Sequence, residues 1–202
     1  MRTYPVALVV EGLPVLVVGG GRVAARKVRG LVEAGAAVHV VATSVCDDIR
    51  GVSGVTWEER PYDARDVVDR RLVVTATGDR AVDAAVHDDA DRAGVWVNAA
   101  DDPTSCTFLL PSVLRRGDLT IAVSTGGRSP AAASWLRARF EDEIGPEYGA
   151  LVDLLAEARD GVRAGGRSSE SVDWRAALDS GILDLVRDGR VAEARERLHA
   201  WL

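Results

Sequence analysis

Three small residues near the start of the chain have the spacing of a dinucleotide-binding turn. Gly19, Gly21 and Ala24 occupy the three positions of the GxGxxG/A pattern. In that pattern the first glycine permits a tight turn, the second lets a pyrophosphate approach the backbone, and the third keeps helix and strand close. A phosphate at this point would meet unpaired N–H groups at the start of a helix. The pattern therefore predicts a dinucleotide site, the alternative being a glycine turn that is only structural.

Two adjacent carboxylates could supply an acid or base to such a site. Asp101 and Asp102 lie in a polar loop that begins at Asn98 and ends at Pro103. The loop follows an expected strand, and open α/β sheets bind ligands at the carboxyl ends of their strands. Hydride transfer needs only positioning and an acid or base, because the cofactor carries the redox chemistry. A carboxylate here can take the proton as hydride leaves, unless both residues merely cap the turn.

The identity of the dinucleotide depends on the end of the second expected strand. An acid that holds the ribose hydroxyls usually stands there, about 20 residues past the glycines. Here the sequence reads Val-Ala-Thr-Ser, ending in Thr43 and Ser44, with neither an acid nor an arginine for a 2′-phosphate. The cofactor is NAD held by Thr43 or Ser44, or NADP, and the missing arginine favours NAD.

These residues are positioned by an alternation of strands and helices. Apolar runs without polar alternation predict parallel strands that are covered on both faces. The strands are expected at 15–18, 37–42, 55–58, 72–76 and 95–99. A helix is expected to begin at Arg22 and another to span 80–93, capped by Asp79. Thr77 follows the fourth strand and is expected at the cofactor edge. The order predicts a Rossmann-type α/β fold with a parallel sheet.

The pattern changes after residue 112. An expected hairpin is followed by a second glycine loop, in which Ser129 and Pro130 are the preferred start of a helix over 131–144. The rest of the chain is helical in pattern. We therefore expect an NAD-binding domain at 1–112, a dimerisation segment at 113–146 and a small all-α domain at 147–202. Exposed strand edges and an apolar helix face within 111–144 predict a homodimer.

Composition narrows the class of protein. The 202 residues carry a net charge of −6, which argues against nucleic-acid binding, and 47% of them are hydrophobic, enough for a substantial core. No stretch approaches the ~20 apolar residues of a membrane span. Two cysteines, Cys46 and Cys106, are too few for a disulfide framework, so the reducing cytoplasm is the expected compartment.

Several segments together resemble the siroheme synthase family, in its precorrin-2 dehydrogenase and sirohydrochlorin ferrochelatase module. The segments are 18–27, 75–77, 98–101 with Pro103 and Phe108, 111–112, and 122–131. The family oxidises precorrin-2 to sirohydrochlorin with NAD. The resemblance implies that Asp101 is the catalytic aspartate and that precorrin-2 is the substrate. The residues that it assigns to NAD are Arg22, Val23, Thr43 and Ser44, and those expected in the substrate cleft are Asn98, Thr125, Gly126 and Arg128.

Two other functions stay open from the residues themselves. A regulatory NAD-sensing module would need neither a base nor a second glycine loop. A different Rossmann oxidoreductase usually brings a Tyr/Lys or His dyad, whereas the one lysine here, Lys27, lies on the first helix.

Members of the siroheme synthase family differ on whether they also insert iron. No histidine is placed beside Asp101 by the sequence, so we expect no metal site and at most weak chelatase activity.

Overall fold

The computed structural model describes residues 2–100 and 102–202. The chain divides into two compact units, the first ending at Leu110 and the second beginning at Pro111. Among the described residues, no helix combines the length and the apolar character that crossing a membrane requires.

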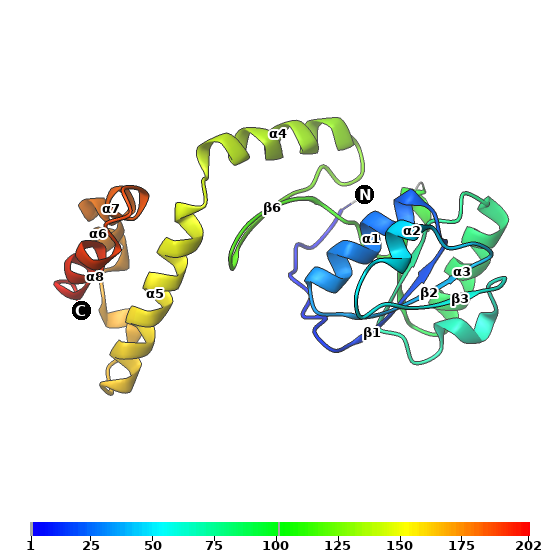
Figure 1. Ribbon diagram of the computed structural model, residues 1–202, viewed down its shortest axis with the longest axis horizontal. Helices are drawn as coiled ribbons and strands as arrows, with labels where there is room; N and C mark the ends of the chain where they lie inside the picture. Colours follow the sequence, from blue (N-terminus) through cyan, green and yellow to red (C-terminus); the bar gives the residue numbers. More distant parts are fainter. Residues whose placement is uncertain (1, 101) are drawn as a thin grey trace. The chain divides into compact units, whose positions relative to one another are not determined.

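The first unit is a parallel five-stranded sheet in the order β3-β2-β1-β4-β5. Figure 1 labels its first three strands and the helices α1 to α3 around them. The strands are β1 (Pro14–Val18), β2 (Ala37–Ala42), β3 (Thr56–Glu59), β4 (Leu72–Thr75) and β5 (Trp96–Ala99). The helices are α1 (Arg22–Glu33), α2 (Asp47–Arg50) and α3 (Arg80–Arg92), with 3₁₀ turns at Ala64–Val67 and Pro103–Ser105. The chain runs outward from β1 to β3 and then returns to β4, so the strand order reverses between β1 and β4. This arrangement confirms the predicted Rossmann-type fold.

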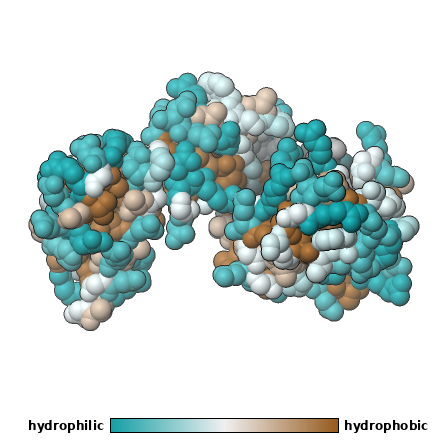
Figure 2. Space-filling model, in the orientation of Figure 1, coloured by the Kyte–Doolittle hydropathy of each residue, from teal (hydrophilic) through white to brown (hydrophobic). Residues whose placement is uncertain are grey.

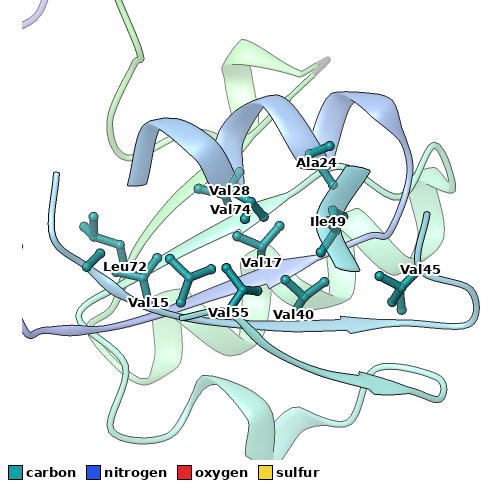
Figure 3. Close-up of a cluster of buried hydrophobic side chains, with 14 of the residues drawn as sticks. Val15, Val17, Ala24, Val28, Val40, Val45, Ile49, Val55, Leu72 and Val74 are labelled. Atoms are coloured by element: carbon teal, nitrogen blue, oxygen red, sulfur yellow. The ribbon is translucent and has the colours of Figure 1, made fainter. Parts of the chain in front are cut away.

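Burial on both sides explains the unbroken apolar runs of the central strands. Val15 and Val17 of β1 face the layer that holds α1, whereas Leu16 and Val18 face the layer that holds α3. All four are at most 2% exposed. Figure 3 shows the first layer, with Ala24 and Val28 of α1 and Ile49 of α2 lying over the strands. Parallel strands covered by helices on both faces have no position at which a polar side chain reaches water.

The second unit combines a hairpin with helices. Strands β6 (Ser112–Arg116) and β7 (Leu119–Val123) pair antiparallel. They are followed by α4 (Pro130–Glu143), α5 (Glu147–Ala164), α6 (Trp174–Ala177), α7 (Leu183–Arg187) and α8 (Val191–His199), with a 3₁₀ turn at Ser169–Ser171 and a π turn at Leu178–Ile182. As predicted, Ser129 caps α4 by accepting from the Ala132 N–H at 3.2 Å, and Pro130 is the first helical residue.

The last helices of this unit share a core of their own. Leu151 and Leu154 of α5 pack with Leu185 of α7 and Leu198 of α8, all at most 7% exposed. The hairpin and α4 bury fewer side chains. Among their described residues, Leu114 is the buried one of the hairpin strands and Ala133 the buried one of α4.

Candidate functional site

The turn between β1 and α1 is packed too closely for side chains at its first two glycines. Gly19 has φ +121°, and a Cβ there would clash with the carbonyl oxygen of Ala76. A Cβ on Gly20 would clash with the carbonyl oxygen of Ser44. The turn is also tied to the strand after it, since the Gly19 N–H donates to Val41 O at 2.9 Å. The backbone here is therefore fixed against the loops that follow β2 and β4.

Gly21 has the opposite surroundings. Apart from Gly21 itself and the adjoining backbone, no described atom lies within 4 Å of the place where a Cβ would stand. Gly21 is the N-cap of α1, and no side chain of the described residues caps that helix. The first N–H groups of α1 are thus left for another acceptor, beside an open space that a Cβ would begin to fill. This is the arrangement in which a helix N-terminus receives a phosphate.

A cleft of about 620 Å³ opens over this turn. It lies at the carboxyl ends of β1 to β4, at the point where the strand order reverses, which is where open α/β sheets bind ligands. Its lining residues are Val18, Gly19, Gly20, Gly21, Val41, Ala42, Thr43, Ser44, Arg60, Pro61, Tyr62, Ala76, Thr77, Asp79, Ala81, Val82 and Ala85.

The structure brings together five of the residues assigned to the cofactor from the sequence. Gly19, Gly21, Thr43, Ser44 and Thr77 all line the cleft. Arg22 and Val23 begin α1, where both side chains are exposed. Neither of these two is among the described residues that line the cleft.

Thr77 is held in place by a carboxylate on α3. Asp83 Oδ1 accepts from the Thr77 hydroxyl at 2.7 Å and from the hydroxyl of Thr75, which is fully buried at the end of β4. The Thr77 hydroxyl also accepts from the Asp79 N–H at 3.0 Å. Because one carboxylate joins the strand end to the loop, the β4–α3 wall of the cleft has a defined shape.

Sequence reasoning missed Arg60 and Tyr62, which form the wall that follows β3. The Tyr62 hydroxyl donates to Asp89 Oδ2 on α3 at 2.9 Å. Burial, and then this hydrogen bond, raise the pKa of Tyr62, so the phenol stays protonated. No local motif marks this wall in the sequence, because its place depends on strand pairing. β3 lies beside β2 with Ala42 opposite Glu59, and the backbone N–H of Arg60 donates to Ala42 O at 2.8 Å.

The Arg60 guanidinium is surrounded by carboxylates. It donates to both oxygens of Asp66, at 2.8 and 2.7 Å, and its Nε donates to Glu58 at 2.6 Å. Hydrogen bonds to Asp66 and then to Glu58 raise the pKa of Arg60. Burial opposes ionisation of Asp66, but hydrogen bonds from Arg60 and from the Asp63 N–H hold its pKa below the ordinary value. Arg60 and Asp66 are therefore both charged at neutral pH.

The loop after β5 contains the predicted catalytic residue Asp101, which lies outside the described residues. Its neighbour Asp102 accepts from the Thr104 N–H at 3.0 Å and from the hydroxyls of Thr104 and Ser105 at 2.6 and 2.7 Å. Those hydrogen bonds lower the pKa of Asp102 to about 2. Asp102 thus caps a turn, which is the alternative that the sequence left open for this pair.

Asn98 supports the same loop from the interior. Its side chain is 5% exposed, and its amide donates to Phe108 O at 3.0 Å and lies 3.5 Å from Cys106 Sγ. The Cys106 sulfur also accepts from the Ala99 N–H at 3.2 Å, and burial raises the pKa of the thiol. Asn98 therefore holds the loop to the segment around Phe108, and its expected place in a substrate cleft stays a prediction.

The second glycine loop belongs to the other unit. The Thr125 hydroxyl accepts from the Ser129 N–H at 3.0 Å and donates to Ser129 O at 3.1 Å. Gly126 has φ +62°, which favours glycine, and Arg128 is exposed. The contact of Thr125, Gly126 and Arg128 with a substrate stays a prediction. Within the described part of the chain, no cluster of three or more His, Cys, Asp or Glu residues is arranged to hold a metal ion.

Comparison with known proteins matches both units. Residues 6–112 match the family described as putative NAD(P)-binding, and residues 116–143 match the central segment of a sirohaem biosynthesis protein. The chain is 38% identical over 203 residues to a siroheme synthase from Methylococcus capsulatus and 37% identical over 204 residues to one from Nitrosomonas eutropha. Each alignment covers 98% of this chain but 43% of the relative, so the chain spans less than half the length of these curated relatives.

A solved structure matches over its whole length. The fold superposes on that of SirC, described as a precorrin-2 dehydrogenase, with a TM-score of 0.76 and 27% identity. The match covers 98% of each chain.

Proposed function

The chain belongs to the putative NAD(P)-binding family and carries the sirohaem biosynthesis central segment, and on that premise we propose that it oxidises precorrin-2 to sirohydrochlorin with NAD. The observation that carries the proposal is the open cleft over Gly21, in a chain that matches a precorrin-2 dehydrogenase over 98% of both lengths. The substrate loses a hydride and a proton, and NAD accepts the hydride.

The cleft residues fit a dinucleotide at two points. The uncapped N–H groups of α1 and the open space at Gly21 suit a pyrophosphate. The hydroxyls of Thr43 and Ser44 line the cleft at the end of β2, where a ribose is usually bound. The absence of an acid there leaves ribose recognition to neutral groups. We propose NAD as the physiological cofactor in preference to NADP.

Asp101 is proposed as the base that receives the proton released during oxidation. The proposal rests on its place in the chain, immediately after the strand end of β5, and on its match to the catalytic aspartate of the resembling family. Precorrin-2 is an acidic macrocycle, and Arg128 in the second glycine loop is an exposed cation suited to a carboxylate. Thr125 and Gly126 shape that loop.

The hairpin and α4 are proposed to form a homodimer interface. A two-stranded hairpin is marginally stable by itself in water, and both outer edges of β6 and β7 lack a neighbouring strand among the described residues. Trp135 and Leu136 of α4 are 59% and 37% exposed, and Figure 2 shows apolar surface over this segment. A second copy could cover these side chains and pair the strand edges.

We place the enzyme in the cytoplasm, in keeping with two free cysteines.

Turnover of precorrin-2 with NAD, followed anaerobically by the absorbance of reduced nicotinamide, tests the activity. Asp101→Asn should lower the rate by about 10²- to 10⁴-fold, the usual contribution of a general base, and leave the Kd for NAD unchanged. Asp88→Asn, at an exposed aspartate of α3, is the control for the change of charge. A near-normal rate in Asp101→Asn would remove this residue from the mechanism. Binding of NAD without turnover in the unmodified protein would favour a sensor.

Insertion of iron is a separate step, for which we expect at most weak activity. The test supplies sirohydrochlorin and Fe(II) or Co(II) without oxygen and follows the spectrum of the free macrocycle against a control without enzyme. Rates well above the control, lost in Asp101→Ala, would show that the protein is bifunctional.

A further inference from the structure

We propose that Glu58 and Asp66 make the cleft selective for NAD over NADP, by occupying the one arginine that could otherwise bind a 2′-phosphate. The inference rests on the proposed function, because it concerns the same dinucleotide cleft. It assigns cofactor specificity to Glu58 of β3 and to Arg60 and Asp66, which follow that strand, in place of the usual acid at the end of β2.

Arg60 stands where a 2′-phosphate would have to be recognised. It lines the same cleft as Thr43 and Ser44, and it is the one cationic residue among the described residues that do so. Its N–H donates to the carbonyl of Ala42, the residue directly before Thr43. The backbone of Arg60 is therefore anchored next to the strand end that carries the ribose in Rossmann-type folds, where an arginine is the usual partner of a 2′-phosphate.

Four of the five guanidinium N–H groups of Arg60 already have acceptors. Nε donates to Glu58 at 2.6 Å, and Nη1 donates to Asp66 at 2.8 Å and to Pro61 O at 3.1 Å. Nη2 donates to the other oxygen of Asp66 at 2.7 Å. A guanidinium has five N–H groups, so one, on Nη2, is left over. One N–H can meet a neutral ribose hydroxyl, but it cannot form the paired hydrogen bonds by which arginine holds a phosphate.

The charges around Arg60 also disfavour a 2′-phosphate. Two carboxylates face one guanidinium, and Asp79 adds another carboxylate to the lining of the cleft. Of the nearby cations, Arg65 pairs with Asp63 and Arg70 donates to the backbone oxygen of Asp66; neither lines the cleft within the described ranges. A dianionic 2′-phosphate would therefore be repelled, whereas a ribose diol would not.

Removing the carboxylates should convert Arg60 into a phosphate ligand. Glu58→Gln and Asp66→Asn keep the size of each side chain and an oxygen that accepts hydrogen bonds, but remove the charge. A unit charge acting on a phosphate dianion some 6 Å away in a high dielectric changes affinity about tenfold. Each substitution should therefore tighten the Kd for NADP about tenfold and change the Kd for NAD less than about threefold.

The experiment measures the Kd of NAD and of NADP by titration calorimetry on the full chain. The variants are Glu58→Gln, Asp66→Asn, the pair combined, and the combined pair with Arg60→Ala. Glu193→Gln is the matched control, since Glu193 also pairs with an arginine, at 2.5 Å, but lies in the second unit. Asp66 accepts from the Asp63 N–H and supports a turn. Thermal melting therefore accompanies each variant, and the half-exposed Glu58 provides a substitution away from that turn.

We expect the unmodified protein to prefer NAD, the combined pair to lose most of that preference through tighter NADP binding, and Arg60→Ala to abolish the gain. The inference is overturned if NAD binds but the ratio of the two constants is unchanged in Glu58→Gln and in the pair. It is also overturned if the gain survives loss of Arg60. If neither dinucleotide binds the unmodified protein, the proposed function fails and this inference fails with it.

Discussion

Adjacent glycines in the β1–α1 turn should respond to substitution in opposite ways. Gly21→Val should weaken dinucleotide binding strongly and leave the fold intact, because a Cβ at Gly21 points into open space. Gly20→Ala should damage the fold itself, because a Cβ there overlaps the backbone of Ser44. The two residues are neighbours in sequence, so the contrast tests the geometry of the turn and not its general sensitivity.

The expected losses of stability follow from the contacts. Around Gly20 the turn cannot move away, since Gly20 O accepts from the Cys46 N–H and Gly19 N–H donates to Val41 O, both at 2.9 Å. Overpacking of this kind costs about 1–3 kcal/mol or more. At about 4–8 °C per kcal/mol for a unit of this size, Gly20→Ala should lower Tm by about 10 °C. Gly21 is an extended N-cap with φ −89°, and losing a favourable N-cap residue costs about 0.5–1 kcal/mol.

The expected loss of affinity comes from the phosphates. A valine side chain at Gly21 would occupy the approach to the N–H groups of α1. Each hydrogen bond from such a group to a charged phosphate is worth about 1.5–3 kcal/mol, and loss of one or two weakens Kd about 10²-fold. Gly21→Ala, which adds one carbon, should fall between the valine variant and the unmodified protein.

Circular dichroism melting and calorimetric titration with NAD measure the two effects separately. Gly21→Val should melt close to the unmodified protein and show no heat of binding at micromolar NAD. Unchanged affinity in Gly21→Val would mean that the pyrophosphate does not approach this turn, and the assignment of the cleft would be wrong. Normal melting of Gly20→Ala would refute the close packing on which the stability argument depends.

Three further outcomes are expected. Asp83→Ala should leave the buried Thr75 hydroxyl at the end of β4 without its partner, which costs about 1–3 kcal/mol of stability. It should also weaken NAD binding, because Thr77 loses the carboxylate that holds it. An unchanged Kd for NAD, measured where the variant is still folded, would contradict the role of Thr77. Asp102 has its pKa lowered from 3.8 to about 2, so its stabilising effect is complete above about pH 4 and is lost as the pH falls toward 2. Asp102→Asn should flatten the pH dependence of Tm in that window, and an unchanged profile would refute the cap. Trp135→Glu should give the mass of one chain in sedimentation equilibrium where the unmodified protein gives two, and a monomer in both would rule out the proposed interface.

The fold was accessible from the sequence because local and tertiary signals agree along the first half of the chain. The run from Val15 to Val18 is apolar without alternation because both faces of β1 are covered. In most strands the first or the last residue differs by one from the expected position, because the outermost pair of a ladder depends on the neighbouring strand. β4, for example, ends at Thr75, one residue earlier than expected.

The candidate site was accessible where a local motif defines it. Gly19 and Gly21 were recognisable because the turn imposes its own requirements on sequence, and Thr43, Ser44 and Thr77 because they follow strands that end at the same edge. Asn98 shows what the sequence alone leaves undetermined. A polar residue near the end of a strand can turn inward to support a loop, and no spacing in the sequence distinguishes an inward amide from one that faces a ligand.

Arg60 shows why the remaining wall could not be predicted. It lies 17 residues beyond Thr43 in sequence, and it has no motif of its own. Its place beside the ribose edge depends on β3 pairing with β2 in the register that sets Ala42 opposite Glu59. A slip of that pairing by one residue would turn every side chain of β3 to the other face of the sheet and carry Arg60 away from Ala42. The cofactor specificity that we propose for this cleft therefore depends on strand register. That register is set by the packing of the whole sheet and not by a local motif.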